Sequence, residues 1–341
     1  MTQGGPLPHN SQMTPRDSAD DPLPLWRRLL LRRLKVLGAL ALVLAAISAG
    51  IYLLAPQWIV RLNEWRLASS AGLESHSVDT GQQRWDYYEG GSGPTIVLLH
   101  GFDGSRDNWV PVAKELTGNF RVLIPDLPGW GQSMPVAGED YGAQAQARRL
   151  AGFIDRVAPS NMILIGHSMG GLIAGRYAAE HPRHVAAVGF VDSAGVGHLQ
   201  APVTAGDNPF AFTDRAGFRR MLELVFAEPP VVPGRIADVF VQRNRVRIDM
   251  IRRTFAELGK PDAVHGLESV LPRIDKPVLV MWCHDDKLIG SGAIDVFREK
   301  LRSSPRIDVT TLFGCSHLPM LEKPHATAQA ITRFMLPAHP R

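Results

Sequence analysis

Cysteine is scarce in this chain, with only two copies, Cys283 and Cys315, among 341 residues. Their spacing matches no zinc-binding pattern, and two cysteines form one bridge at most, so a disulfide-rich scaffold is excluded. Each cysteine follows a predicted strand, so the two could lie close together. We nevertheless expect two buried free thiols, because unpaired cysteine behaves as a small apolar side chain.

Net charge is also low outside the N-terminal region. The whole chain carries a formal charge of +4, and residues 1–35 account for +3 of it through six basic and three acidic groups. Only +1 remains for all other residues, so the globular part presents no strongly basic surface. We therefore predict no nucleic-acid partner.

Motifs for phosphate, cofactor and metal binding are missing as well. Residues 126–133, Asp-Leu-Pro-Gly-Trp-Gly-Gln-Ser, superficially suggest a phosphate loop. They lack the GxGxxG and Walker spacings, and a proline stands where backbone amides would be needed. We interpret them as a tight loop beside the functional site. No set of His, Cys, Asp and Glu has metal-ligand spacing, so the sequence implies no cofactor and no metal.

One long apolar run stands near the N-terminus. Residues 36–55 are 20 consecutive uncharged residues, and as a helix they would span about 30 Å, the hydrocarbon thickness of a bilayer. A cleaved signal peptide is the alternative. However, the run is longer than the usual apolar region of about 7–15 residues, and no clear Ala-x-Ala site closes it. We predict an uncleaved transmembrane signal anchor.

The residues on either side of the anchor predict its surroundings. Residues 1–35 are expected to be a disordered, basic segment, because the first 25 are poor in large apolar side chains. Five basic residues stand directly before the anchor, so the positive-inside rule places the N-terminus in the cytoplasm and the larger part of the chain across the membrane, in the periplasm of a Gram-negative cell. Residues 56–72 are a predicted juxtamembrane helix, which could lie in the membrane interface or pack on the domain.

Buried strands and helices alternate from about residue 73 onward. Short apolar runs such as Thr95-Ile96-Val97-Leu98-Leu99 are typical of strands covered on both faces. The expected strands are 76–79, 84–88, 95–99, 120–124, 162–165, 185–191, 278–281 and 307–313, and the expected helices are 109–116, 141–157, 172–181, 293–301 and 325–336. The alternation predicts an α/β fold with a doubly wound, mostly parallel sheet over residues 73–341.

The alternation breaks between about residues 195 and 273. This stretch contains helical segments at 214–226, 235–242 and 246–258, and it contains no buried strand run. We predict a helical cap inserted over the functional site. Most of its aromatic and aliphatic side chains must pack the cap, and some could line a tunnel for an acyl chain.

The strongest motif is Gly-x-Ser-x-Gly at Gly166, Ser168 and Gly170. An apolar strand run precedes it and an alanine-rich helix follows, and this context makes Ser168 a candidate nucleophile. The backbone at such a turn is strained and closely packed, so the glycines avoid a clash that a Cβ would cause. The helix N-terminus favours negative charge that develops near the serine.

A serine nucleophile needs a base, an acid and donors for the oxyanion. In this type of fold the acid and then the histidine follow the serine along the chain, each after a strand. His317 is therefore the candidate base and Asp286 the candidate acid, while Asp285 and Asp192 remain alternatives for the acid.

The expected oxyanion donors are the backbone N–H groups of Met169 and Phe102. Met169 directly follows the nucleophile, and Phe102 belongs to the loop after the strand at 95–99. His100 in that loop, and His167 inside the Gly-x-Ser-x-Gly turn, are predicted to be structural.

Together these motifs resemble the α/β-hydrolase superfamily over roughly residues 73–337. The anchor, the Trp/Arg-rich helix after it and the block 314–324 are similar to membrane-bound monoacylglycerol lipases and related bacterial lipases. The resemblance implies hydrolysis of lipid esters through an acyl-Ser168 intermediate. One departure is Trp282-Cys283, where the family usually has Trp-Gly, and this could shift the turn that carries Asp286.

The nucleophile narrows the function further. Haloalkane dehalogenases and epoxide hydrolases carry an aspartate at the position of Ser168, which argues against both. Our hypothesis is a membrane-anchored lipase with a lipid ester and the bilayer as its partners. The alternative is a tethered carboxylesterase or carbon–carbon bond hydrolase for soluble substrates. A third possibility is a non-catalytic membrane-binding domain, against which the complete set of Ser168, His317 and Asp286 argues.

Overall fold

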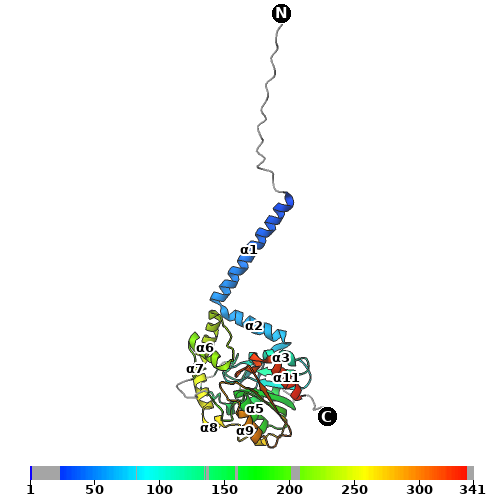
Figure 1. Cartoon of the computed structure of the whole chain (residues 1–341), viewed down its shortest axis with the longest axis vertical. Coiled ribbons are helices and arrows are strands. Elements are labelled where there is room, and N and C mark those ends of the chain that lie inside the picture. The colour runs from blue at the N-terminus through cyan, green and yellow to red at the C-terminus, as the bar shows by residue number, and fades with distance from the viewer. Residues whose placement is uncertain are drawn as a thin grey trace. The chain divides into compact units, whose positions relative to one another are not determined.

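The computed structural model describes Met1 and residues 24–335, except residues 82, 134, 136–137, 158–159 and 201–207. The chain divides into two units, Met1–Leu54 and Ala55–Arg341. The first unit contains one long helix, α1, which spans Leu25–Leu54 (Figure 1). Within the described part of the chain, α1 is the single helix that is long and apolar enough to cross a membrane.

Helix α1 begins well before the uncharged run at 36–55. The expectation that residues 1–35 are disordered is therefore wrong for residues 25–35, which are helical. Leucine and arginine make up most of these residues, which include no glycine or proline, and both residue types favour the helix. Residues 2–23, the remainder of the expected disordered segment, lie outside the described residues.

The second unit opens with helix α2, Pro56–Ser70, which agrees closely with the predicted juxtamembrane helix at 56–72. Proline at the first helical position suits the start of a helix, because its missing N–H would have no partner there. Val60 and Ala68 are buried against the domain, whereas Trp58, Leu62 and Trp65 are exposed. Helix α2 therefore packs on the domain with one side and leaves an apolar side uncovered.

A single eight-stranded sheet forms the centre of this unit, in the order β1-β2-β4-β3-β5-β6-β7-β8. Strands β1 and β2 pair antiparallel with their neighbours, and the pairs from β4 through β8 are parallel. This confirms the predicted α/β fold with a mostly parallel sheet. The strands are β1 Leu73–Asp79, β2 Arg84–Gly90, β3 Thr95–Leu99, β4 Arg121–Pro125, β5 Met162–His167, β6 Val185–Val191, β7 Val278–Cys283 and β8 Ile307–Leu312.

Helices cover both faces of the sheet, so successive side chains of a strand enter different cores. In β3, Val97 and Leu99 belong to one buried cluster, and Ile96 and Leu98 belong to the other. Because both faces of this strand are fully buried, its sequence is a continuous apolar run. Besides α1 and α2 the helices are α3 Val110–Leu116, α4 Ala143–Val157, α5 Met169–Glu180, α6 Arg215–Val225, α7 Gly234–Leu258, α8 Pro261–Val264, α9 Ala293–Lys300, α10 Pro319–Glu322 and α11 Pro324–Met335, with 3₁₀ turns at Arg106–Trp109 and Leu271–Arg273.

Two of the predicted helices differ from the structure by more than one or two residues at an end. Helix α5 begins at Met169 instead of 172, because Gly170 and Gly171 weaken the helical pattern although close packing requires them. The cap segments predicted at 235–242 and 246–258 are one helix, α7. Arg243 and Asn244, which lie between the two predicted segments, bond to Glu64 of α2 and to Asp103 of the loop after β3.

Cys283 and Cys315 form a disulfide bond, so the expectation of two free thiols is wrong. Cys283 is the last residue of β7, and Cys315 follows the neighbouring strand β8. Adjacent parallel strands bring the two residues together at the same edge of the sheet, where their Cα atoms lie 5.6 Å apart. Sequence spacing alone does not reveal this pairing of neighbouring strands.

Loss of this bridge is expected to destabilise the domain. The bond closes a loop with a sequence separation of 32 residues, and loops of this size lower the entropy of the unfolded chain enough to contribute about 2–4 kcal/mol. We expect the double variant Cys283→Ala/Cys315→Ala to unfold in urea with a free energy lower by about that amount. The disulfide itself can be checked by thiol titration of the wild-type protein, denatured without a reducing agent. Two reactive thiols in this sample would contradict the disulfide.

Candidate active site

Ser168, Asp286 and His317 all follow strands whose carboxyl ends meet at one edge of the sheet. Ser168 follows β5, Asp286 lies shortly after β7, and His317 lies shortly after β8. In open α/β sheets this edge is where ligands bind.

The backbone around Ser168 is a strained strand-to-helix turn. Ser168 has a φ of 52°, in the left-handed region that side chains other than glycine seldom adopt. A Cβ on Gly166 would lie 2.1 Å from the carbonyl oxygen of Gly170, and one on Gly170 would lie 2.5 Å from that of His100. Both positions therefore require glycine, as the motif predicted. Strain of this kind is maintained where surrounding packing enforces it, often at functional sites.

A chain of hydrogen bonds links the three side chains. His317 Nε2 lies 3.0 Å from Ser168 Oγ, and His317 Nδ1 lies 2.8 Å from Asp286 Oδ2. The other carboxylate oxygen of Asp286 accepts the N–H groups of Leu288 and Ile289, at 2.8 and 3.0 Å. The carboxylate is thus held in place and fixes the tautomer with the proton on Nδ1, which leaves Nε2 able to accept the serine proton.

The two alternative acids lie elsewhere. Asp285 is exposed and contacts His284, with 2.7 Å between its Oδ1 and Nδ1 of the ring. Asp192 is fully buried, and its Oδ1 accepts the N–H of Cys283. Burial raises the pKa of Asp192 well above its usual value, and the charge of Asp286 adds to this effect. The structure places Asp286, not Asp285 or Asp192, against His317.

Backbone contacts hold His317 from two sides. Its N–H donates to the carbonyl oxygen of Val225 at the end of α6, 3.1 Å away. Its carbonyl oxygen accepts from Nε2 of His167 at 2.7 Å. Burial lowers the pKa of His167 far below its usual value, so this ring is neutral and donates from Nε2. His167 therefore positions the loop of His317, a more specific role than the structural one that the sequence predicted.

Glu322 connects the same loop to the cap. One carboxylate oxygen accepts the N–H of Ser316 and the other accepts the N–H of Ala227, both at 2.8 Å. The sequence pointed to Glu322 only as part of the block 314–324. No local pattern could have indicated its contact with the cap, because Ala227 is 95 residues away along the chain.

The loop after β3 lies directly against Ser168. A Cβ on Gly101 would be 2.9 Å from Cβ of Ser168, so only glycine fits there. Within the residues that the structure describes, the N–H groups of Phe102 and Met169 donate to no protein group. Both residues line the cavity above Ser168. These amides are therefore free to donate to a ligand in the cavity.

His100 gives this loop its shape. Its Nδ1–H donates to the carbonyl oxygen of Gly101 at 2.8 Å, and its Nε2 accepts the N–H of Leu127 at 2.9 Å. Complete burial lowers the pKa of His100 to about 4, so the ring is neutral at physiological pH. With both nitrogens in use, His100 has the structural role that the sequence predicted.

Comparison with known proteins identifies the family of this chain. The model of the alpha/beta hydrolase family matches residues 96–330. The chain belongs to the alpha/beta hydrolase family. This membership confirms the resemblance found in the sequence.

Relatives of this hydrolase include several named lipases. The chain is similar to lipase 1 of Psychrobacter immobilis, with 30% identity over 73% of this chain and 79% of the relative. It is 25% identical to monoacylglycerol lipase ABHD6 of Homo sapiens, over 89% of this chain and 94% of the relative. The crystal structure of a membrane phospholipase A, a bacterial virulence factor, superposes with a TM-score of 0.77 and 32% identity, over 88% of this chain and 97% of that one.

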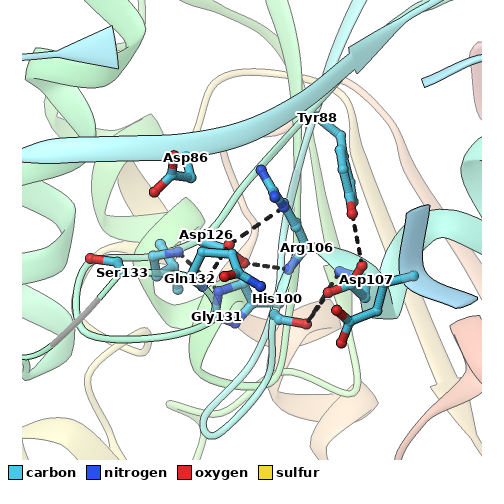
Figure 2. Close-up of polar contacts among 12 residues, drawn as sticks. Asp86, Tyr88, His100, Arg106, Asp107, Asp126, Gly131, Gln132 and Ser133 are labelled. Carbon is cyan, nitrogen blue, oxygen red and sulfur yellow. Dashed lines mark hydrogen bonds and ion pairs between the residues drawn. The ribbon is translucent and has the colours of Figure 1, made fainter. Parts of the chain in front are cut away.

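In the loop at 126–133 of this hydrolase, the backbone amides of Leu127, Gly129 and Gln132 donate to groups within the protein. Asp126 accepts the N–H groups of Arg106 and Gln132, at 2.8 and 3.0 Å, and Arg106 Nε lies 3.5 Å from the same carboxylate (Figure 2). Burial raises the pKa of Asp126 to about 7, although Arg106 opposes this rise. Because these amides already have partners, the loop offers them to no phosphate. It lines the active-site cavity through Trp130, as the predicted loop beside the site.

The active-site cavity of the hydrolase has a volume of about 600 Å³. One wall is apolar and comes mainly from the cap, with Phe212, Phe218, Met221, Leu222, Val225 and Phe240. A more polar wall comes from α2, the loop after β3 and α7, with Asn63, Asp103, Asn108 and Asn244. Among the described residues, no three His, Cys, Asp or Glu side chains are grouped so that they could hold a metal ion.

Proposed function

We propose that this hydrolase is a membrane-anchored serine ester hydrolase that cleaves carboxylic esters of monoacylglycerol type. The observation that carries the proposal is the hydrogen-bonded series from Ser168 through His317 to Asp286 at the base of a largely apolar cavity. A serine, a histidine and a carboxylate in this geometry are the groups that acyl transfer requires. Relatives named lipases support the ester as the substrate class.

In the first half of the reaction, His317 Nε2 takes the proton of Ser168 while Oγ attacks the ester carbonyl carbon. The carbonyl oxygen becomes an oxyanion, which accepts hydrogen bonds from the N–H groups of Phe102 and Met169. The protonated His317 is stabilised by the Asp286 carboxylate. When the tetrahedral intermediate collapses, the bond to the alcohol breaks and the alcohol leaves with the proton from His317.

In the second half, water releases the acyl group. His317 removes a proton from water, and the resulting hydroxide attacks the acyl carbon of the Ser168 ester. The same two amides stabilise the second oxyanion. Collapse of this intermediate returns the proton to Oγ of Ser168 and frees the fatty acid.

The cavity suits a long acyl chain. Its apolar wall includes several phenylalanines of the cap, among them Phe212, Phe218 and Phe240. Each methylene group that moves from water into such a wall contributes about 0.8 kcal/mol. An ester with a long chain therefore gains more binding energy here than a short one.

Helix α2 supports association with the bilayer. Trp58, Leu62 and Trp65 lie on one side of the helix at spacings of four and three residues, and each is at least 60% exposed. Tryptophan and leucine beside basic residues are typical of helices that lie in the membrane interface. Residues of the other side, Val60 and Asn63, line the active-site cavity. We infer that α2 lies in the interface and forms the membrane-side wall of the cavity.

The orientation of the anchor is part of the proposal. The basic residues before the uncharged run favour a cytoplasmic N-terminus and a catalytic domain on the far side. The disulfide between Cys283 and Cys315 supports the same orientation, because such bonds persist in oxidising compartments and are rare in the cytosol. In a Gram-negative cell the domain would be periplasmic.

A substrate profile tests the proposed function. We expect detergent-solubilised full-length protein to hydrolyse a long-chain 1-monoacylglycerol with a kcat/KM at least about tenfold above that for a water-soluble butyrate ester, because only the longer chain fills the apolar wall. The measurement is fatty-acid release under identical detergent conditions, with Ser168→Ala as the blank. Preference for the butyrate ester would mean that the anchor only localises the enzyme to the membrane and that the natural substrate is a water-soluble ester.

A further inference from the structure

Among the carboxyl groups that line the cavity and have no part in the proposed reaction is that of Asp103. Asp103 follows Phe102, whose N–H is an expected oxyanion donor, and it lines the same cavity as Ser168. Its backbone has a φ of 54°, in the left-handed region. Short polar residues tolerate this conformation better than most others. The loop thus holds a carboxyl group next to an expected oxyanion donor, in the same cavity as Ser168.

Asn244 of α7 holds Asp103 from the cap side. The Nδ2 group of Asn244 donates to Oδ2 of Asp103 at 3.3 Å and to the carbonyl oxygen of Phe210 at 2.9 Å. Since a carbonyl oxygen can only accept, the contact with Phe210 fixes the orientation of the amide. The second oxygen of Asp103, Oδ1, has no hydrogen-bond partner among the described residues.

The surroundings make this free oxygen significant. Burial raises the pKa of Asp103 to about 7, although Arg247 and the hydrogen bond from Asn244 oppose the rise. Arg247 donates hydrogen bonds to the carbonyl oxygens of Gly129 and Gly131, so its positive charge stabilises the ionised form of Asp103 only in part. A polar group taken out of water is unfavourable unless it gains a partner, and a substrate hydroxyl can supply one.

The charges nearby decide which polar group fits. Arg243, the other cation of this wall, is paired with Glu64 of α2 at 2.9 Å. A phosphate would therefore meet carboxyl groups and cations that are already bonded. A neutral hydroxyl can donate to Asp103 in its ionised form and can also accept from it when it is protonated.

We propose that Asp103 is a specificity residue that binds a free hydroxyl of the alcohol part of the ester, held in place by Asn244. The enzyme would then select esters of polyols such as glycerol over esters of simple alcohols and over phosphate-bearing lipids. The inference rests on the proposed function, because it assigns the alcohol side of the same site. The apolar wall of the cap receives the acyl chain, and the polar wall around Asp103 receives the alcohol.

The test compares two esters of one fatty acid, the 1-monoacylglycerol and the methyl ester. In Asp103→Gly, the ratio of their kcat/KM values is expected to fall at least about tenfold, because an unfilled hydrogen bond discriminates by this order. Asp103→Asn is expected to lower the ratio less, since the amide still accepts a hydrogen bond. Glycine and asparagine both tolerate the positive φ, so both variants should fold. Asp249→Asn, at an exposed carboxylate on α7, is the matched control with an unchanged ratio.

A binding measurement separates this inference from the proposed function. A 1-O-alkylglycerol ether cannot be hydrolysed, and we expect it to bind wild type more tightly than the 1-alkanol of equal chain length, with the difference lost in Asp103→Gly. Equal ratios in wild type and Asp103→Gly, or wild-type preference for a lysophospholipid over the monoacylglycerol, would overturn the inference. Failure of wild type to hydrolyse any ester would overturn the proposed function, while binding of the ether would still decide the role of Asp103.

Discussion

Replacing Ser168 by alanine is expected to lower kcat by roughly 10⁴- to 10⁶-fold. The change removes one oxygen atom, Oγ, which lies 3.0 Å from Nε2 of His317. Without it no acyl-enzyme forms, and the remaining groups can only orient the substrate and stabilise an oxyanion. The measurement is monoacylglycerol hydrolysis together with labelling by a fluorophosphonate probe, which should mark wild type and not the variant.

The fold should survive this change. Alanine is smaller than serine and keeps the same backbone strain at φ 52°, so the melting temperature should stay within a few degrees of that of wild type. Ser193→Ala is the matched control, because Ser193 is also buried beside the turn but its Oγ donates to the carbonyl oxygen of Ala194. This control should retain most of the activity. Substantial turnover by folded Ser168→Ala would contradict the acyl-serine mechanism.

The positions of Ser168, Asp286 and His317 could be anticipated because each depends on local sequence. A strand predicted from an apolar run ends at a known residue, and parallel strands carry their following loops to one edge of the sheet. The motif around Ser168 adds a steric requirement that only Gly166 and Gly170 satisfy. Chemistry then limits the partners to a histidine and a carboxylate in a fixed chain order.

Contacts between distant segments could not be anticipated in this way. The bond between Asn244 and Asp103 joins residues 141 apart, and that between Arg243 and Glu64 joins residues 179 apart. In the sequence both cap residues are polar positions between two predicted helical segments, where side chains usually face water. The disulfide was missed for a related reason, since it depends on β7 and β8 being neighbours in the sheet.

Replacing Asp286 by asparagine is expected to lower kcat by roughly 10⁴-fold with little change in KM. Asparagine has nearly the same shape, and its oxygen can still accept the N–H groups of Leu288 and Ile289. Its amide nitrogen then faces Nδ1 of His317 as a donor, so Nδ1 must accept and the proton moves to Nε2. In that tautomer the ring cannot take the proton of Ser168, and it also lacks the negative partner that stabilises its charged form.

Steady-state kinetics of three variants decides the assignment of the acid. Asp285→Asn, at an exposed neighbouring carboxylate, should change kcat by no more than about twofold. Asp192→Asn should also lose far less activity than Asp286→Asn, because burial and the charge of Asp286 favour a neutral Asp192, which asparagine imitates. Asp192 accepts the N–H of Cys283, close to the loop that carries Asp286, so it is the alternative acid that this comparison tests. A larger loss in Asp192→Asn than in Asp286→Asn would therefore transfer the role of the acid from the loop after β7 to the end of β6.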